Sequence, residues 1–131
     1  MILEQVATRK TSVLVVDDDA DTCENLKDIL EELDYEVRAT IYPEEAIAWT
    51  NERGFDLTIL DLKMPRMSGL ELYGELMRVR DDTKAVISTA FAETETVRSA
   101  LRQGVAEVWR KPVDVEELLR AVRNLTDRKS A

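Results

Sequence analysis

Hydrophobic and polar positions divide the chain into short apolar runs and longer amphipathic stretches that follow one another along its length. The runs VLVV, LTIL and AVIS lack a regular alternation of apolar and polar residues, which is typical of central strands in a parallel sheet covered on both faces. We expect strands over 12–16, 36–39, 57–60, 85–88 and 107–109.

The stretches between these strands carry apolar residues at helical spacing, as in Leu26, Ile29, Leu30 and Leu33. We expect helices over 21–33, from Pro43 to Gly54, after Ser68, over 93–101 and after Asp114. Because strands and helices alternate, the pattern predicts an α/β fold: a doubly wound parallel sheet with helices on both faces.

Composition narrows the class of protein. A length of 131 residues suits one domain, which we place at 11–126, with flexible termini at 1–10 and 127–131. A net charge of −9 argues against direct nucleic acid binding. The sequence shows no membrane-spanning run and no secretory signal, and its single cysteine fits a reducing compartment, so we expect a cytoplasmic protein. The absence of histidine excludes His-dependent catalysis and a phosphohistidine in this chain.

Polar residues follow four of the predicted strands. In an open parallel sheet, ligands bind outside the carboxyl ends of the strands, so side chains at these positions should converge. The residues at these ends are Asp17, Asp18 and Asp19 after the first strand, Asp61 after the third, Thr89 after the fourth and Lys111 after the fifth.

The first of these turns is rich in acid and lacks glycine, so it should repel anions and attract a hard cation. Oxygen-only ligands in a partly open site suit Mg²⁺, or Mn²⁺. Asp17, Asp18 and Asp61 carry three negative charges, which a divalent ion and Lys111 would balance.

Each residue also has a simpler interpretation when it is taken alone. Asp19 or Asp21 suits a helix N-cap or first turn better than a metal site. Asp61 could be a solvated loop acid, Thr89 an ordinary strand-end residue and Lys111 a surface lysine. The joint placement of complementary groups at one sheet edge favours a functional site.

Four stretches in this order, VLVVDDD, LTILDLKMPRMSGLEL, AVISTA and WRKPV, resemble the receiver domain of two-component response regulators, of the chemotaxis-regulator-like kind. The resemblance covers about 11–126 and implies a flavodoxin-like fold with strand order 2-1-3-4-5 and five helices. It also implies a phosphoprotein that works in phosphorelay signal transduction. Such a domain accepts a phosphoryl group from a sensor histidine kinase or phosphotransfer protein with Mg²⁺, and is a signalling switch rather than an enzyme.

The resemblance assigns a metal site to the acidic residues. It implies that Asp18 binds Mg²⁺ directly and that Asp17 binds it through water or as a secondary ligand. Asp61 and the backbone carbonyl of Lys63 would complete the protein's share of the ligands.

The resemblance also assigns the phosphoryl chemistry. Asp61 would be the phosphoacceptor, Lys111 would pair with the phosphoryl oxygens, and Thr89 would be the hydroxyl that turns toward them. Such bonds to a phosphoryl group are charge-assisted, so they can bias a two-state loop. Pro65 and Gly69 match the loop after the phosphoacceptor, and the bond from Lys111 to proline would be cis.

The sequence departs from the family pattern near the fifth strand. Many receivers have Tyr or Phe where this chain has Val108, and the neighbouring Trp109 should face the opposite side of the sheet. We expect Trp109 to pack against the last helix, and Thr89 to act through its loop on the fourth helix. Lys63 and Phe91, two residues after Asp61 and Thr89, favour a slowly hydrolysed phosphoaspartate.

Two other functions stay open. Asp17 and Asp19 have the D-x-D spacing of haloacid dehalogenase-type phosphatases, although Asp21 stands where that motif has Thr or Val. The phosphorylated residue, Asp61 or Asp17, would discriminate between the families. A scaffold that binds partners without phosphorylation is disfavoured because none of the key residues is missing.

The output of the domain is not readable from the sequence. The chain is either a single-domain regulator or part of a longer protein, and its downstream target or effector domain is unknown. The fourth helix, fifth strand and fifth helix form the expected contact face, which is also a possible dimer face. Residues near this face are Arg98, Arg102, Trp109 and Arg110.

Overall fold

A five-stranded sheet forms the centre of the protein. The structure, a computed structural model, describes residues 10–127. All strand pairs are parallel and the order is β2-β1-β3-β4-β5, which confirms the predicted topology. The strands are β1 (Ser12–Val16), β2 (Glu36–Thr40), β3 (Leu57–Asp61), β4 (Ala85–Thr89) and β5 (Glu107–Arg110). The outer parts of the termini that we expected to be flexible, 1–9 and 128–131, lie outside the described residues.

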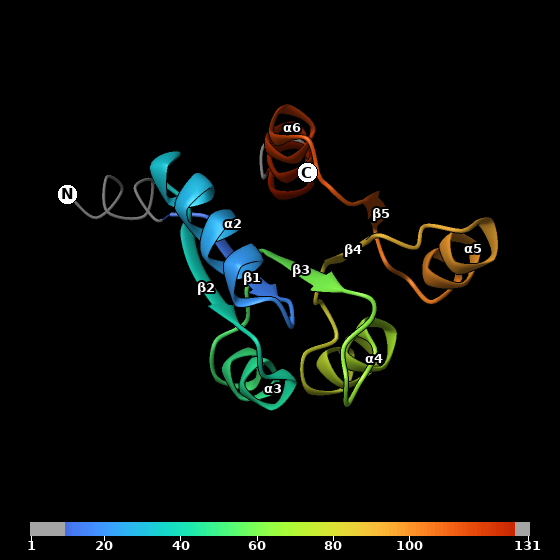
Figure 1. The fold of residues 1–131 in the computed structure, drawn as a ribbon. Coiled ribbons are helices and arrows are strands. Elements are labelled where there is room, and N and C mark those ends of the chain that lie inside the picture. The colour runs from blue at the N-terminus through green and yellow to red at the C-terminus, as the bar shows by residue number, and fades with distance from the viewer. Residues whose placement is uncertain (1–9, 128–131) are drawn as a thin grey trace.

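Five helices in the described part of the chain cover the sheet on both faces (Figure 1). They are α2 (Ala20–Glu32), α3 (Pro43–Glu52), α4 (Gly69–Val79), α5 (Thr94–Arg102) and α6 (Val115–Thr126). Helices α2 and α6 lie on one face, and α3, α4 and α5 lie on the other (Figure 1). Within residues 10–127, no helix is long and apolar enough to cross a membrane.

Two hydrophobic clusters fill the space between the sheet and the helices. On one face, Leu14 and Leu60 of the sheet pack in a cluster with Leu72 of α4. On the other, Val13 and Ile59 belong to a cluster that also contains residues of α2 and α6. Every residue of β1, β3 and β4 is buried, which explains why their sequences lack polar alternation.

The helix ends follow local sequence signals. Asp19 is the N-cap of α2, as its position before an amphipathic stretch suggested, and Asp114 caps α6. Gly54, just past α3, adopts a φ of 72°, which a side chain would strain. Ser68 and Glu71 form a reciprocal capping box at the start of α4. These caps fix the directions in which α2 and α4 leave the functional edge of the sheet.

Thr50 in α3 is a local weak point of the core. Its side chain is 1% exposed, and among residues 10–127 its Oγ1 is the buried side-chain polar atom without a hydrogen-bond partner. We expect Thr50→Val to raise the free energy of unfolding by about 1 kcal/mol, because an unsatisfied buried hydroxyl is removed. Urea denaturation measures this difference.

Thr126→Val is the matched control, since the Thr126 hydroxyl donates a 2.7 Å hydrogen bond to the carbonyl of Val122 in α6. This substitution should leave stability unchanged or lower it. A destabilised Thr50→Val protein would show that the hydroxyl has a partner in solution.

Candidate functional site

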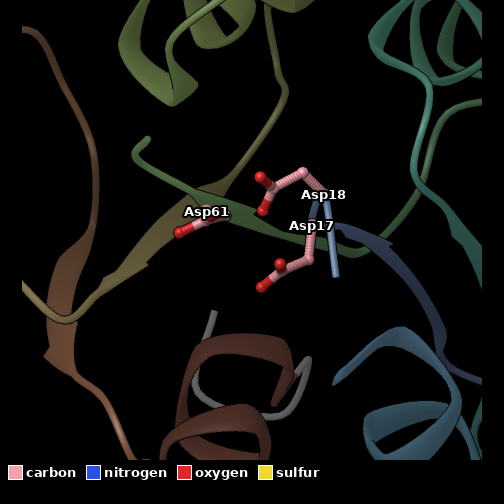
Figure 2. Close-up of side chains that lie close together, drawn as sticks. All are labelled: Asp17, Asp18 and Asp61. Atoms are coloured by element: carbon pink, nitrogen blue, oxygen red, sulfur yellow. The ribbon is translucent and has the colours of Figure 1, made fainter. Parts of the chain in front are cut away.

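Three carboxylates meet at the carboxyl edge of the sheet. Asp17 and Asp18 follow β1, and Asp61 is the last residue of β3. One oxygen from each lies within 4.8 Å of the others, and Figure 2 shows the side chains directed toward the same space. Asp17 and Asp61 are 3% and 7% exposed, whereas Asp18 is exposed. The sequence therefore located a cluster whose oxygen ligands fit a hard divalent cation.

Lys111 reaches the two buried carboxylates from the end of β5. Its Nζ donates to Asp17 Oδ2 at 2.7 Å and to Asp61 Oδ1 at 3.2 Å. Its backbone N–H donates to the carbonyl of Thr89 at 2.9 Å, which fixes the lysine beside β4. The peptide bond between Lys111 and Pro112 is cis, as the resemblance implied. The interpretation of Lys111 as an ordinary surface lysine is therefore wrong.

Asp19 lies beside the cluster but serves the helix. Its carboxylate accepts hydrogen bonds from the backbone N–H of Asp21 at 3.0 Å and from the hydroxyl of Thr22 at 3.1 Å. Its own N–H donates to Asp17 Oδ1 at 2.9 Å. Asp19 thus orients Asp17 and caps α2, in agreement with the simpler interpretation of this residue.

Burial and neighbouring charges shift the pKa values of Asp61 and Lys111. Burial, and then the negative charge of Asp17, raise the pKa of Asp61 to about 6, although Lys111 opposes this rise. Burial lowers the pKa of Lys111, but its hydrogen bond to Asp17 and the charges of both aspartates outweigh this, so the net shift is upward. Three carboxylates with one lysine leave an excess of negative charge, which a cation would relieve.

Asp61→Asn should stabilise the metal-free protein in a pH-dependent way. Because the pKa of Asp61 rises from 3.8 to about 6 on folding, the folded protein binds this proton more tightly than the unfolded chain does. Its contribution to stability is present below the unfolded pKa and is lost as the pH rises through the folded pKa. Asparagine removes that loss, so we expect a gain of about 2 kcal/mol at pH 7 and little at pH 4.

Urea denaturation of both proteins with chelator present, at pH 4 and pH 7, measures this difference. Titrating groups that do not contact Asp61 are common to the two proteins and cancel. An Asn protein that is less stable than wild type at pH 7 would contradict the electrostatic account of the site.

Thr89 is the last residue of β4, the strand next to β3 in the sheet. Its side chain is 1% exposed, and its Oγ1 accepts a 3.0 Å hydrogen bond from the backbone N–H of Phe91. Accepting this bond does not use the hydroxyl proton, which can be donated to another group. The threonine is therefore tied to the loop between β4 and α5 that it is expected to move.

Lys63 and Phe91 meet above the ends of β3 and β4. The Lys63 ammonium lies 3.9 Å from the centroid of the Phe91 ring, within the range of a cation–π interaction. The sequence singled out both residues for a shared effect on hydrolysis but gave no sign that they touch. The expected role of the Lys63 carbonyl as a metal ligand stays a prediction.

Val108 and Trp109 face opposite sides of the sheet, as predicted. Val108 packs against the cluster beneath α3, α4 and α5. Trp109 packs against the other cluster, together with Leu118 of α6, and its Nε1 donates to Glu107 Oε1 at 2.8 Å. The expectation that Trp109 packs against the last helix is confirmed, so this ring does not occupy the position of Val108.

Gly69 lets the start of α4 pack closely against the backbone of Asp61, a role that the sequence analysis did not predict. Its N–H donates to the carbonyl of Leu62 at 2.8 Å, and a Cβ built on it would lie 2.3 Å from the backbone oxygen of Asp61. The signal available was the S-x-x-E pattern of Ser68 and Glu71, a capping box that places Gly69 at the first turn of a helix.

Comparison with known proteins gives the family. The profile of the response regulator receiver domain matches residues 13–123. A response regulator receiver protein of Anaeromyxobacter sp. (strain Fw109-5) is 37% identical over 106 residues, which cover 81% of this chain and 44% of that protein. The chain therefore spans less than half the length of this relative.

Solved structures agree with the match. A CheY-like receiver domain from Methanospirillum hungatei JF-1 has a TM-score of 0.86 and 30% identity, covering 93% of this chain and 98% of that one. The BeF3-activated DrrB receiver domain has a TM-score of 0.82 and 25% identity, covering 92% and 100%. The chain belongs to the response regulator receiver domain family, the signalling switches of two-component phosphorelays.

Proposed function

We propose that this domain, over residues 11–126, accepts a phosphoryl group on Asp61 from a phosphohistidine of a sensor histidine kinase or phosphotransfer protein. The observation that carries the proposal is the convergence of Asp17, Asp18, Asp61 and Lys111 at the carboxyl edge of the sheet in a member of the receiver family. An Asp61 oxygen forms a bond to phosphorus as the bond from phosphorus to the histidine nitrogen breaks, and the nitrogen keeps that electron pair.

Mg²⁺ is the proposed cofactor, and Mn²⁺ has the same ligand preferences. Asp18 and Asp61 would bind the ion directly, Asp17 directly or through water, and the Lys63 carbonyl would complete the protein's ligands. The all-oxygen donor set and the excess negative charge fit such an ion. When bound, it supplies charge that offsets the negative charge gathering on the transferred group.

Lys111 and Thr89 would bind the phosphoryl oxygens and so respond to phosphorylation. The ammonium of Lys111 already lies at hydrogen-bond distance from Asp61, so it can pair with a phosphoryl oxygen there. The Thr89 hydroxyl can donate to a second oxygen. Because Phe91 N–H is bound to that hydroxyl, a shift of Thr89 would move the loop before α5. Because Val108 stands where many receivers have an aromatic ring, we propose that this loop transmits the conformational change to the surface.

The phosphoryl donor would dock beside Lys111. A cavity of about 450 Å³ there is lined mainly by apolar side chains, among them Leu26, Ile29, Pro112 and Val113. A donor that delivers phosphohistidine to Asp61 must cover this edge of the sheet, so we assign the cavity to an apolar face of the donor. Because the donors expected for this family act in the cytoplasm, we place the domain there.

Output would use the face formed by α5, β5 and α6, through a downstream protein or a second copy of this chain. Arg98, Arg102 and Arg110 are exposed on this face, and Leu101 is 47% exposed. Nucleic acid is not expected as a direct ligand, given the net charge of −9.

The phosphatase alternative is less well supported by the geometry. In the D-x-D pattern the second aspartate acts as an acid, but Asp19 is engaged as the N-cap of α2. Asp61, with its raised pKa, lies instead against Asp17 and Lys111. The arrangement favours Asp61 as the acceptor.

Intact mass spectrometry tests the proposal. Incubation with Mg²⁺ and acetyl phosphate should add one phosphoryl group to the protein, and a chelator should abolish the addition. If neither acetyl phosphate nor an autophosphorylated histidine kinase adds a group, the domain would be a scaffold that works without phosphorylation.

A further inference from the structure

A single cation–π contact joins the two loops that border the acidic site. The Lys63 ammonium lies 3.9 Å from the centroid of the Phe91 ring, although both side chains are exposed. Each residue follows its strand by a short step: Lys63 comes two residues after Asp61 in β3, and Phe91 two residues after Thr89 in β4. Asp61 pairs with Ser88 in the sheet, so the two loops emerge side by side.

Two hydrogen bonds, to Thr89 of β4 and from Arg110 of β5, also hold the loop that carries Phe91. The Phe91 N–H donates to Thr89 Oγ1 at 3.0 Å, and Arg110 Nη2 donates to the carbonyl of Ala92 at 3.3 Å. The ring of Phe91 is 51% exposed, so packing in the core contributes little to its position. Lys63 therefore provides a main restraint on the ring itself.

Phosphorylation would change the charge around Lys63. Asp17, Asp18 and Asp61 carry three negative charges, which Lys111 and a divalent ion would balance. Phosphorylation of Asp61 gives an acyl phosphate and replaces one negative charge by the roughly two of a phosphoryl group, which leaves about one negative charge without a partner. Lys63, in the loop directly after Asp61, can supply the missing positive charge.

We propose that the Lys63 ammonium is a shared cation: it rests on the Phe91 ring in the unphosphorylated domain and transfers to the phosphoryl oxygens after phosphorylation, which releases the ring. The inference rests on the proposed phosphorylation of Asp61. A charge-assisted hydrogen bond to a phosphoryl oxygen is stronger than a cation–π contact at an exposed site, so the phosphoryl group wins the competition.

Release of Phe91 adds a second output to the movement of Thr89. The ring becomes free when the threonine to which its N–H is bound turns toward the phosphoryl group. Phosphorylation would thus change both the conformation of the loop before α5 and the apolar surface that this loop exposes. In this chain Phe91 would be the aromatic ring that responds, because Val108 stands where many receivers have a ring.

Fluorine NMR of the protein labelled with 4-fluorophenylalanine tests this inference, because the chain contains only two phenylalanines. Phe55 is the internal control, since Arg53 lies 4.9 Å from its ring centroid in a cation–π contact of its own at the other end of the sheet. Beryllofluoride with Mg²⁺ serves as the phosphoryl mimic, and its bound fluorines report binding in the same spectrum.

Binding of the mimic should shift the Phe91 resonance and leave the Phe55 resonance in place. In the absence of beryllofluoride, the Phe91 resonance of Lys63→Met should lie closer than that of wild type to the position seen in beryllofluoride-bound wild type. Lys63→Met should also weaken beryllofluoride binding by roughly tenfold, the loss of one charge-assisted hydrogen bond.

Phe91→Leu should have the opposite effect, because it removes the competitor for the ammonium. It should strengthen beryllofluoride binding about threefold, the equivalent of an exposed cation–π contact. In the Lys63→Met background the same substitution should change nothing, which separates competition for Lys63 from a general change in the loop.

The outcomes separate the inference from the function on which it rests. Bound beryllofluoride with an unmoved Phe91 resonance, or equal binding by wild type and Lys63→Met, would overturn the shared cation and leave phosphorylation of Asp61 standing. Absence of any bound beryllofluoride resonance would overturn both.

Discussion

Lys111→Met is expected to destabilise the metal-free protein by about 3 kcal/mol at pH 7, the typical result of removing one partner of a buried ion pair. Lys111 Nζ lies 2.7 Å from an oxygen of Asp17 and 3.2 Å from one of Asp61, and these carboxylates are 3% and 7% exposed. Without the ammonium, the two nearly buried carboxylates have no counter-charge, so the pair must either bear the repulsion or take up a proton. Urea denaturation with chelator present measures the loss.

The double variant with Asp61→Asn is the control for this result. It removes one of the two carboxylates, so the effect of Lys111→Met should be smaller in that background by 1 kcal/mol or more, an estimate taken from coupling between groups in contact. Mg²⁺ should also restore more stability to Lys111→Met than to wild type, because it supplies the missing positive charge. An equal loss in both backgrounds would mean that Lys111 acts by packing and not by charge.

Gly69→Ala should destabilise the protein by about 3 kcal/mol, at the upper end of what overpacking causes. The new Cβ would lie 2.3 Å from the backbone oxygen of Asp61 and 3.1 Å from Cδ1 of Ile87, so the main chain at the phosphoacceptor must shift. The free energy of unfolding and the rate of phosphoryl incorporation should fall together, because the strain falls on Asp61 itself.

Gly74→Ala in the same helix is the matched control. A Cβ at Gly74 meets nothing within 4 Å, and alanine is the better helix former, so this protein should be more stable by roughly 0.5–1 kcal/mol. Its phosphorylation should equal that of wild type. If Gly69→Ala behaved like Gly74→Ala, the close approach of α4 to Asp61 would not exist in solution.

The sequence pattern predicted the parallel sheet and the location of the site, and the family resemblance supplied the strand order. Unbroken apolar runs such as Val13–Val16 belong to strands buried on both faces, and a parallel sheet brings all their carboxyl ends to one edge. Acidic residues after β1 and β3 therefore had to meet. All five strands begin at the predicted residue, four of them end one residue later than predicted, and α2 and α5 are displaced by one residue at both ends.

Contacts between loops could not be predicted in the same way. The contact between Lys63 and Phe91 depends on the path of two loops, and no periodic pattern encodes that path. The approach of Gly69 to Asp61 depends on how closely α4 packs against β3, and the unsatisfied hydroxyl of Thr50 depends on which neighbours α3 finds. The parallel sheet follows from the hydrophobic pattern, whereas these features require the packed structure.

The central claim is that Asp61 carries the phosphoryl group, and the most direct test is to identify the modified residue. After phosphorylation with acetyl phosphate and Mg²⁺, borohydride reduces an aspartyl phosphate to homoserine, and peptide mass spectrometry locates that residue. The account predicts homoserine at position 61 and none in the Asp61→Asn protein. Homoserine at position 17, or modification that persists in Asp61→Asn, would contradict it.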